Sequence, residues 1–304
     1  MDCILHHFDI SPFAEKVRLG FGLKGLAWQS VQIPVVMPKP DLTALTGGYR
    51  KTPVLQIGAD IYCDTQRIAV ELEQRYPART LFPQGSKGLC LALANWSDAA
   101  FFQPGAGLSM GTNSDLPGEI LKDRREFFSF LDFASLPSEL PHLYAGFSAQ
   151  VQVLETMLAD GRDYLLGAQP SWADILGYFP VWMCRGNIRG GDALLARFSR
   201  VLAWEPRVAG FGHGERRELD AEAALSIARE QQSVAEVLVL EEATPGLTAG
   251  MQVAVTPEDY GAVPVAGELV RLTPQDIAVR RTDPRAGEVV VHFPRSGYRV
   301  EKTS

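Results

Sequence analysis

The sequence predicts a chain of three parts: an α/β domain over residues 1–80, an all-helical domain over residues 86–232, and a small, barrel-like all-β module over residues 235–304. Two changes of pattern along the chain carry this prediction. Short apolar runs alternate with amphipathic segments at the start, helical periodicity prevails in the middle, and short apolar runs between Pro, Gly and Asp turns fill the end. With 304 residues, of which 46% are hydrophobic, the chain can bury more than one core.

The first domain opens with a strand, a tight loop and a helix. Residues 3–8 are mostly apolar, and alternation along this strand predicts that one of His6 and His7 points inward and the other outward, with no chemical role for either. Ser11 stands where an N-cap belongs and Pro12 fits the first helical position, so a helix is expected from there.

The rest of this domain predicts two more strands and a helix after an extended segment over residues 28–36. Residues 52–57 form a strand that begins with Pro53, and a turn over residues 58–60 returns the chain as a hairpin. Asp64 then begins a helix that ends before Pro77. The predicted order is β-α-β followed by β-β-α.

The middle of the chain predicts a helical domain. Its clearest start signal is Ser171 with Asp174 three residues later, a capping-box pattern that opens a helix with a broad apolar face. A helix of this kind is expected to lie at the centre of its domain. Further helices are predicted around residues 96–102, 120–133 and 151–158.

The end of the chain predicts a β module with a core of its own. The charged, alanine-rich segment 216–232 is expected to form an amphipathic helix that links this module to the rest. The predicted strands lie at residues 235–240, 251–255, 269–272, 277–280 and 289–293.

Composition excludes several classes of protein. The net charge is −7, and the basic residues are scattered, so no nucleic-acid partner is expected. The four cysteines lie far apart without metal-type or disulfide-type spacing, which predicts reduced thiols and no metal site. No apolar stretch is long enough to span a membrane and no export signal is evident, so a soluble, cytoplasmic protein without a membrane partner is expected.

Four local features resemble the cytosolic glutathione transferases of the serine or cysteine type. They are residues 11–18 (SPFAEKVR), residues 52–55 (TPVL), residues 64–68 (DTQRI), and residues 166–167 (LG) with 170–174 (PSWAD). The resemblance covers roughly residues 1–210 and implies a thioredoxin-like first domain with a helical second domain. The β module is not typical of that family.

The resemblance implies that Ser11 holds the thiolate of glutathione. A free thiol with a pKa of about 8.5 is mostly protonated at neutral pH, so the protein must stabilise the anion. A serine hydroxyl and the start of a helix supply a hydrogen bond and a positive dipole end. The alternative for Ser11 is a simple N-cap. Because serine cannot form a mixed disulfide, thiol exchange at this position is disfavoured.

The resemblance also implies a site for the rest of the glutathione peptide. Pro53 is expected to follow a cis peptide bond that presents the backbone of Thr52 to the ligand; the alternative is an ordinary edge-strand proline. Lys51 is a candidate for the glycine carboxylate, or else an exposed loop lysine. Asp64 and Thr65 are expected to bind the γ-glutamyl end, and their alternative role is helix capping.

The function expected from these residues is transfer of glutathione to a small apolar electrophile, by a homodimer that uses glutathione as co-substrate and no metal. One alternative is a glutathione-dependent isomerase or dehalogenase, which would use the same thiolate on another electrophile. A different class of alternative is a non-catalytic scaffold or binding protein, since one fold hosts both kinds.

Overall fold

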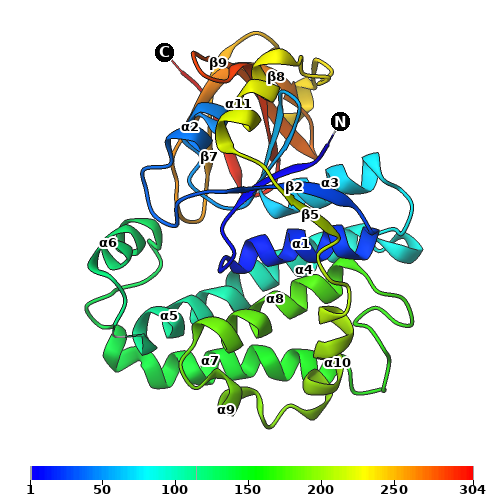
Figure 1. Cartoon of the computed structure of the whole chain (residues 1–304), viewed down its shortest axis with the longest axis vertical. Coiled ribbons are helices and arrows are strands. Elements are labelled where there is room, and N and C mark those ends of the chain that lie inside the picture. Colours follow the sequence, from blue (N-terminus) through cyan, green and yellow to red (C-terminus); the bar gives the residue numbers. More distant parts are fainter. Residues whose placement is uncertain (1, 114, 304) are drawn as a thin grey trace. The chain divides into compact units, whose positions relative to one another are not determined.

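The computed structural model describes residues 2–113 and 115–303, and the chain divides into two compact units (Figure 1). The first unit contains the chain up to Ser11, Ala27–Glu71 and everything from Arg216 onward. The second unit contains Pro12–Leu26 and Leu72–Glu215. Both units are therefore built from segments that are distant in the sequence.

The first unit is built on one mixed sheet. Its strands follow the order β11-β7-β8-β9-β10-β4-β3-β1-β2-β5, and β6 pairs with β8 off this path. The strands are β1 (Ile4–His7), β2 (Ala27–Gln32), β3 (Val54–Ile57), β4 (Asp60–Cys63), β5 (Glu215–Glu218), β6 (Leu238–Val239), β7 (Gln252–Pro257), β8 (Val265–Leu272), β9 (Asp276–Asp283), β10 (Gly287–Pro294) and β11 (Tyr298–Lys302).

The predicted fold class is confirmed. A β-α-β segment with parallel β1 and β2 precedes the antiparallel strands β3 and β4, which is the thioredoxin-like order. Helices fill the middle of the chain, and β7 to β11 form the predicted all-β region at its end. The boundaries predicted at residues 80, 86, 232 and 235 stay predictions.

The C-terminal strands do not have the separate core that the sequence predicts. β10 pairs in parallel with β4, with Val291 opposite Ile61, so the two sets of strands form one sheet. They also share one hydrophobic cluster, whose buried members include Leu42, Val54, Ile61, Leu225, Val279 and Val291. The physical reason is that β4 would otherwise be an edge with unpaired N–H and C=O groups, and β10 pairs with that edge.

Two helices of the first unit pack together beside this sheet, α2 (Pro40–Thr46) and α11 (Ala221–Glu230) (Figure 1). The sequence predicted no element where α2 lies. It ends at Gly47, whose φ of 78° lies in the left-handed region and where an added Cβ would approach the side chain of Arg281. The segment predicted as one helix over residues 216–232 divides into β5 and α11, because residues 215–218 join the sheet beside β2.

The second unit is helical, as predicted. Its elements are α1 (Pro12–Lys24), the 3₁₀ turn η1 (Pro83–Gly85), α4 (Lys87–Asn95), the π-helical turn η2 (Trp96–Phe101), α5 (Phe102–Thr112), α6 (Gly118–Phe127), α7 (Leu136–Met157), α8 (Trp172–Asn187), α9 (Gly191–Leu195) and α10 (Ser199–Ala209). The helix α3 (Thr65–Arg75) and the 3₁₀ turn η3 (Glu241–Ala243) complete the chain. The helix predicted from residue 151 begins earlier, at Leu136.

The capping box predicted for α8 is present, and this helix is buried along most of its length. One carboxylate oxygen of Asp174 accepts hydrogen bonds from the backbone N–H and the hydroxyl of Ser171, both at 2.9 Å. The other oxygen accepts the Leu165 N–H at 2.7 Å and the indole N–H of Trp204 at 3.1 Å. Burial nevertheless raises the pKa of Asp174. The cap therefore joins three segments of the helical unit.

Candidate functional site

The sheet register brings three of the predicted site segments to the same end of neighbouring strands. His6 of β1 lies opposite Val54 of β3, and Val54 lies opposite Cys63 of β4. Ser11 comes shortly after the end of β1, Pro53 directly before β3, and Asp64 directly after β4. Because β3 runs antiparallel to the other two strands, all three residues leave the sheet at this end.

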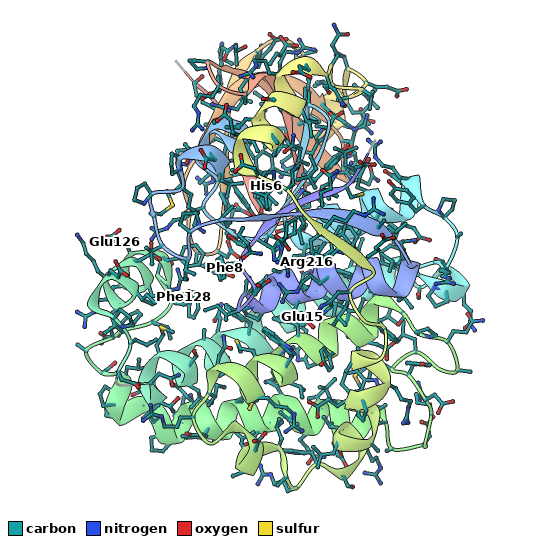
Figure 2. All side chains as sticks on the ribbon, in the orientation of Figure 1. His6, Phe8, Glu15, Glu126, Phe128 and Arg216 are labelled. Carbon is teal, nitrogen blue, oxygen red and sulfur yellow. The ribbon has the colours of Figure 1, made fainter. Side chains whose placement is uncertain are left out.

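The peptide bond between Thr52 and Pro53 is cis, as predicted. Pro53 is buried, whereas Thr52 is half-buried. Lys39 donates a hydrogen bond to the Thr52 hydroxyl at 3.3 Å, and its ammonium lies 5.3 Å from the centre of the Phe8 ring. Phe8 follows β1 directly (Figure 2). The Thr52 side chain is thus held by a lysine that sequence reasoning did not single out.

Ser11 is buried, with 3% of its surface exposed, and it is the last residue before α1. Its backbone N–H donates to the carbonyl of Phe8 at 3.1 Å, which closes the turn that leaves β1. A serine hydroxyl carries one proton to donate and two lone pairs. Its position after the turn is compatible with either predicted role, the N-cap or the thiolate contact.

Asp64 occupies the turn between β4 and α3 with a φ of 76°, in the left-handed region. One carboxylate oxygen accepts the backbone N–H of Gln66 at 2.9 Å, which is a capping contact. The other accepts the hydroxyl of Tyr298 at 3.1 Å. A carboxylate has about four acceptor positions, so the capping contact by itself does not prevent Asp64 from binding a ligand cation. Thr65, the first residue of α3, is 4% exposed.

Lys51 is engaged by the C-terminal β region. Its ammonium forms an ion pair with Asp259, and it lies 4.5 Å from the centre of the Tyr260 ring. The lysine is half-buried and therefore differs from the exposed loop lysine that one interpretation predicted. A ligand carboxylate at Lys51 would have to compete with the carboxylate of Asp259.

Sequence reasoning missed a set of residues that surround these positions. Tyr49 and Tyr298 lie 249 positions apart, yet their hydroxyls are 3.0 Å apart. Burial raises the pKa of both phenols well above the ordinary tyrosine value, and the nearby Asp64 carboxylate adds to the shift. No local pattern could have indicated this pair, because the two residues lie far apart in the sequence and come together only in the folded chain.

The sequence predicted that one of His6 and His7 points outward, but both are buried, with 1% and 0% exposure (Figure 2 labels His6). All four residues of β1 are buried in the middle of the sheet, so neither face of this strand meets water. His6 contacts the Gln56 side chain at 2.8 Å, and burial lowers its pKa to about 4. His7 contacts the Ser30 hydroxyl at 3.1 Å.

A second buried polar cluster lies where β10 meets β4. Asp60 contacts the imidazole of His292 at 2.8 Å and accepts hydrogen bonds from the Ser233 hydroxyl at 2.5 Å and the Val234 N–H at 2.9 Å. Burial alone would raise the pKa of Asp60, but these contacts lower it overall. Ser233 donates to the aspartate and not to the histidine, so the arrangement differs from a nucleophile with its base. The cluster joins the C-terminal region to β4.

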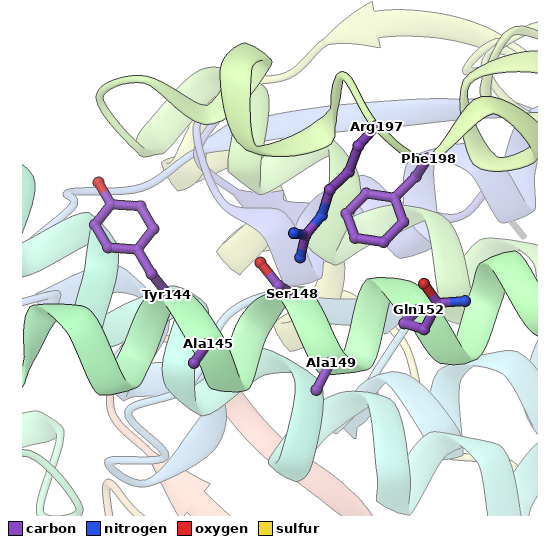
Figure 3. Close-up of a pocket in the computed structure, with 7 residues that line it drawn as sticks. All are labelled: Tyr144, Ala145, Ser148, Ala149, Gln152, Arg197 and Phe198. Carbon is purple, nitrogen blue, oxygen red and sulfur yellow. The ribbon is translucent and has the colours of Figure 1, made fainter.

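The helical unit carries a separate surface hollow of about 690 Å³. Figure 3 shows that one side comes from α7 and the other from the segment between α9 and α10. Its lining residues are Tyr144, Ala145, Ser148, Ala149, Gln152, Arg197 and Phe198. The guanidinium of Arg197 lies 4.9 Å from the centre of the Phe198 ring. None of the predicted site residues lies there.

The residues that the structure describes contain no group of three or more His, Cys, Asp or Glu placed to hold a metal ion. Cys3, Cys63, Cys90 and Cys184 are buried and reduced. Burial raises the pKa of Cys63, Cys90 and Cys184, which makes these thiols poor nucleophiles. Within residues 2–113 and 115–303, no helix is both long enough and apolar enough to cross a membrane.

A β-α-β unit followed by a cis-proline hairpin, in a chain that also has an all-helical unit, defines a thioredoxin-like protein of the glutathione-transferase type. Comparison with known proteins agrees. Residues 5–80 match the model of the glutathione S-transferase N-terminal domain. The chain is 39% identical to a solved GST-like protein from Pseudomonas syringae, with a TM-score of 0.80 and coverage of 99% of both chains. The chain therefore belongs to the glutathione S-transferase family.

Two more distant relatives share part of the chain. Glutathione S-transferase U4 from Arabidopsis thaliana is 27% identical over 133 residues, which is 43% of this chain and 59% of that protein. A solved maleyl pyruvate isomerase, a bacterial zeta-class transferase, is 21% identical with a TM-score of 0.50 over 68% of this chain and 92% of its own. At this identity the isomerase shows the fold alone. The match to the Pseudomonas protein covers 99% of this chain and therefore includes the C-terminal strands.

Proposed function

We propose that this protein is a glutathione-dependent transferase in which Ser11 stabilises the thiolate for attack on an apolar electrophile. Members of the family use glutathione as co-substrate. The observation that carries the proposal is the convergence of Ser11, the cis bond before Pro53, and Asp64 at one end of three adjacent strands. These are the positions from which a tripeptide thiol can be held at its cysteine and its γ-glutamyl end.

Ser11 acts by donating its hydroxyl proton to the sulfur. A charge-assisted hydrogen bond of this kind, with the start of the helix that follows at Pro12, favours the anion over the thiol. A shift of two pKa units corresponds to about 2.7 kcal/mol, which these two interactions can supply. In the transfer the sulfur lone pair forms an S–C bond, a leaving group such as halide departs with its electron pair, and the thiol proton has already passed to solvent.

The peptide part of glutathione is held by three contacts in this proposal. The backbone of Thr52 pairs with the cysteinyl residue, as an added extended strand would. Asp64 and the N–H groups at the start of α3, next to Thr65, bind the ammonium and carboxylate of the γ-glutamyl end. Lys51 binds the glycine carboxylate after its ion pair with Asp259 breaks.

The test is calorimetric titration with glutathione, followed by conjugation of a reactive aryl halide by the wild type and by Ser11→Ala. Saturable binding and a thiol-dependent rate that falls in the variant support the proposal. Binding without any conjugation, together with turnover of a cis-trans isomerisable or halogenated substrate, would favour an isomerase or dehalogenase. A chain that does not bind glutathione at millimolar concentration is a scaffold, and the proposal fails.

The proposal includes a homodimer in the cytoplasm, and both points rest on the family. Size-exclusion chromatography with light scattering at low micromolar concentration measures the first. Fractionation of the source cells measures the second. Neither outcome bears on whether Ser11 holds the thiolate.

A further inference from the structure

We infer that Tyr298, from the C-terminal β region, is a positioning residue of the glutathione site that orients the carboxylate of Asp64. The inference rests on the proposed function, because it assigns a purpose to Asp64 only if that carboxylate binds the γ-glutamyl ammonium. It gives a role to a part of the chain that lies outside the family's N-terminal domain, which the match places at residues 5–80.

The contact is specific in its geometry. The Tyr298 hydroxyl lies 3.1 Å from one oxygen of Asp64, and the Gln66 N–H lies 2.9 Å from the other oxygen. Two donors on the two oxygens fix the rotation of the carboxylate plane. Tyr298 itself is held at the start of β11, where it pairs with Pro257 of β7 and is 2% exposed. Asp64 is half-buried, so a ligand can still reach it.

The two tyrosines form a relay with one direction. A phenol has a single proton to donate. Since Tyr298 gives its proton to Asp64, the hydroxyl of Tyr49, 3.0 Å away, must donate to the oxygen of Tyr298. Burial raises the pKa of both phenols well above the usual value, so both keep their protons at neutral pH. The order Tyr49 to Tyr298 to Asp64 strengthens the final hydrogen bond, because each donor polarises the next.

The chemistry of these donors suits a site for a cation. A backbone N–H and a phenol are neutral, so they orient the carboxylate without cancelling its charge. These two donors therefore leave the negative charge of Asp64 in place to attract an ammonium group. A site whose carboxylate is held before binding loses less conformational entropy when the ligand arrives. The C-terminal region thereby contributes to affinity for the γ-glutamyl end, in addition to its apolar side chains that pack in the shared hydrophobic cluster.

The competing explanation is that Tyr298 serves packing alone. Its ring lies 5.3 Å from that of Phe293, within the shared hydrophobic cluster. Tyr298→Phe separates the two roles, because it keeps the ring and removes only the hydroxyl. Tyr144→Phe, in the helical unit, is the matched control for loss of a tyrosine hydroxyl elsewhere.

The experiment measures the Kd of the full-length protein for glutathione and for N-acetylglutathione, which lacks the ammonium. For Tyr298→Phe we expect the Kd for glutathione to rise about 3- to 10-fold, less than a direct charged contact would cost, because the tyrosine acts through Asp64. The Kd for N-acetylglutathione should stay constant, so the ratio of the Kd for glutathione to the Kd for N-acetylglutathione rises about 3- to 10-fold. In an Asp64→Ala background the same change should have no further effect on glutathione binding. Tyr144→Phe should bind as the wild type does.

Each failure has its own signature. If the wild type does not bind glutathione, the proposed function fails and takes the inference with it. If the wild type binds glutathione and Tyr298→Phe leaves the ratio of Kd values unchanged, the inference alone is overturned. If Tyr298→Phe does not fold, Tyr49→Phe takes its place. This variant removes the first donor of the relay, and an unchanged ratio there overturns the inference equally.

Discussion

Deleting residues 233–304 should unfold the remaining chain, because the C-terminal strands and the thioredoxin-like strands share one hydrophobic cluster. The deletion exposes apolar side chains of the remaining residues that are buried in the intact chain. Leu42, Leu45, Ile61 and Leu225 are each at most 1% exposed in the intact chain. Exposing four large apolar side chains at about 1.5–3 kcal/mol each costs roughly 6–12 kcal/mol. That range matches the roughly 5–15 kcal/mol by which whole domains are stable.

The deletion also opens β4 as an unpaired edge. β10 pairs with β4 over residues 60–62, and Val290 donates its N–H to the carbonyl of Ala59 at 3.0 Å. Without β10 these groups would be available to strands of other molecules, which favours aggregation. We therefore expect the shortened chain to be insoluble, or soluble with exposed apolar surface and no cooperative melt.

The assay compares solubility, circular dichroism melts and binding of a hydrophobic dye for the full and shortened chains. A point variant gives a graded control: Ile61→Ala should lose about 2–5 kcal/mol of unfolding free energy. Ile10→Ala, at a side chain that is 59% exposed, should be close to neutral. A shortened chain that melts cooperatively near the temperature of the full chain and still binds glutathione would refute the reasoning.

Three further predictions concern the site and its surroundings. Ser11→Ala should lower the conjugation rate about 10- to 100-fold and change glutathione affinity much less, because a hydrogen bond to a charged group acts mainly on the thiolate. The pH–rate profiles of both proteins with an aryl halide check this. Superimposable profiles would show that Ser11 has no part in the mechanism. Asp259→Asn should lower the Kd for glutathione about 3- to 10-fold, because Lys51 can then bind the glycine carboxylate without competition from Asp259. Calorimetric titration of this variant beside the control Glu258→Gln measures the change. An unchanged or higher Kd contradicts the prediction. The pKa of buried His6 falls from 6.5 to about 4 on folding, so stability is intact above pH 6.5 and declines by up to about 3 kcal/mol as pH falls to 4. Denaturant melts at several pH values should show a flatter profile for His6→Gln than for the exposed-site control His142→Gln, and parallel profiles would disprove the assignment.

The local elements were accessible from the sequence because their signals are local. The capping box of Ser171 and Asp174 marks the start of α8, and the cis-proline turn was expected because residues 52–55 resemble that turn in the family. A cap or a turn is specified by residues three or four positions apart. The same holds for Ser11 and Asp64, whose places at the starts of helices follow from their neighbours.

The helix α2 escaped prediction for a related reason. It is seven residues long, follows the cis bond between Met37 and Pro38, and has no side-chain hydrogen bond at its N-cap. A helix this short has little propensity of its own and is stabilised by packing. Leu42 and Leu45 supply that packing in the shared cluster.

Only the tertiary structure decided where the C-terminal strands go and what they touch. Alternating apolar residues predict that a segment forms a strand, but they do not predict which strand it pairs with. The N–H and C=O groups of one strand can form hydrogen bonds with the edge of many others. The pairing of β10 with β4 joins residues 232 positions apart at His292 and Asp60, and the contact of Tyr298 with Asp64 spans 234 positions. The sequence by itself indicated the family, the fold class and the residues expected to hold glutathione, but not α2 or β5. The long-range pairing placed Tyr298, Tyr49 and Asp259 around those residues, since contacts across such separations form only when the whole chain packs.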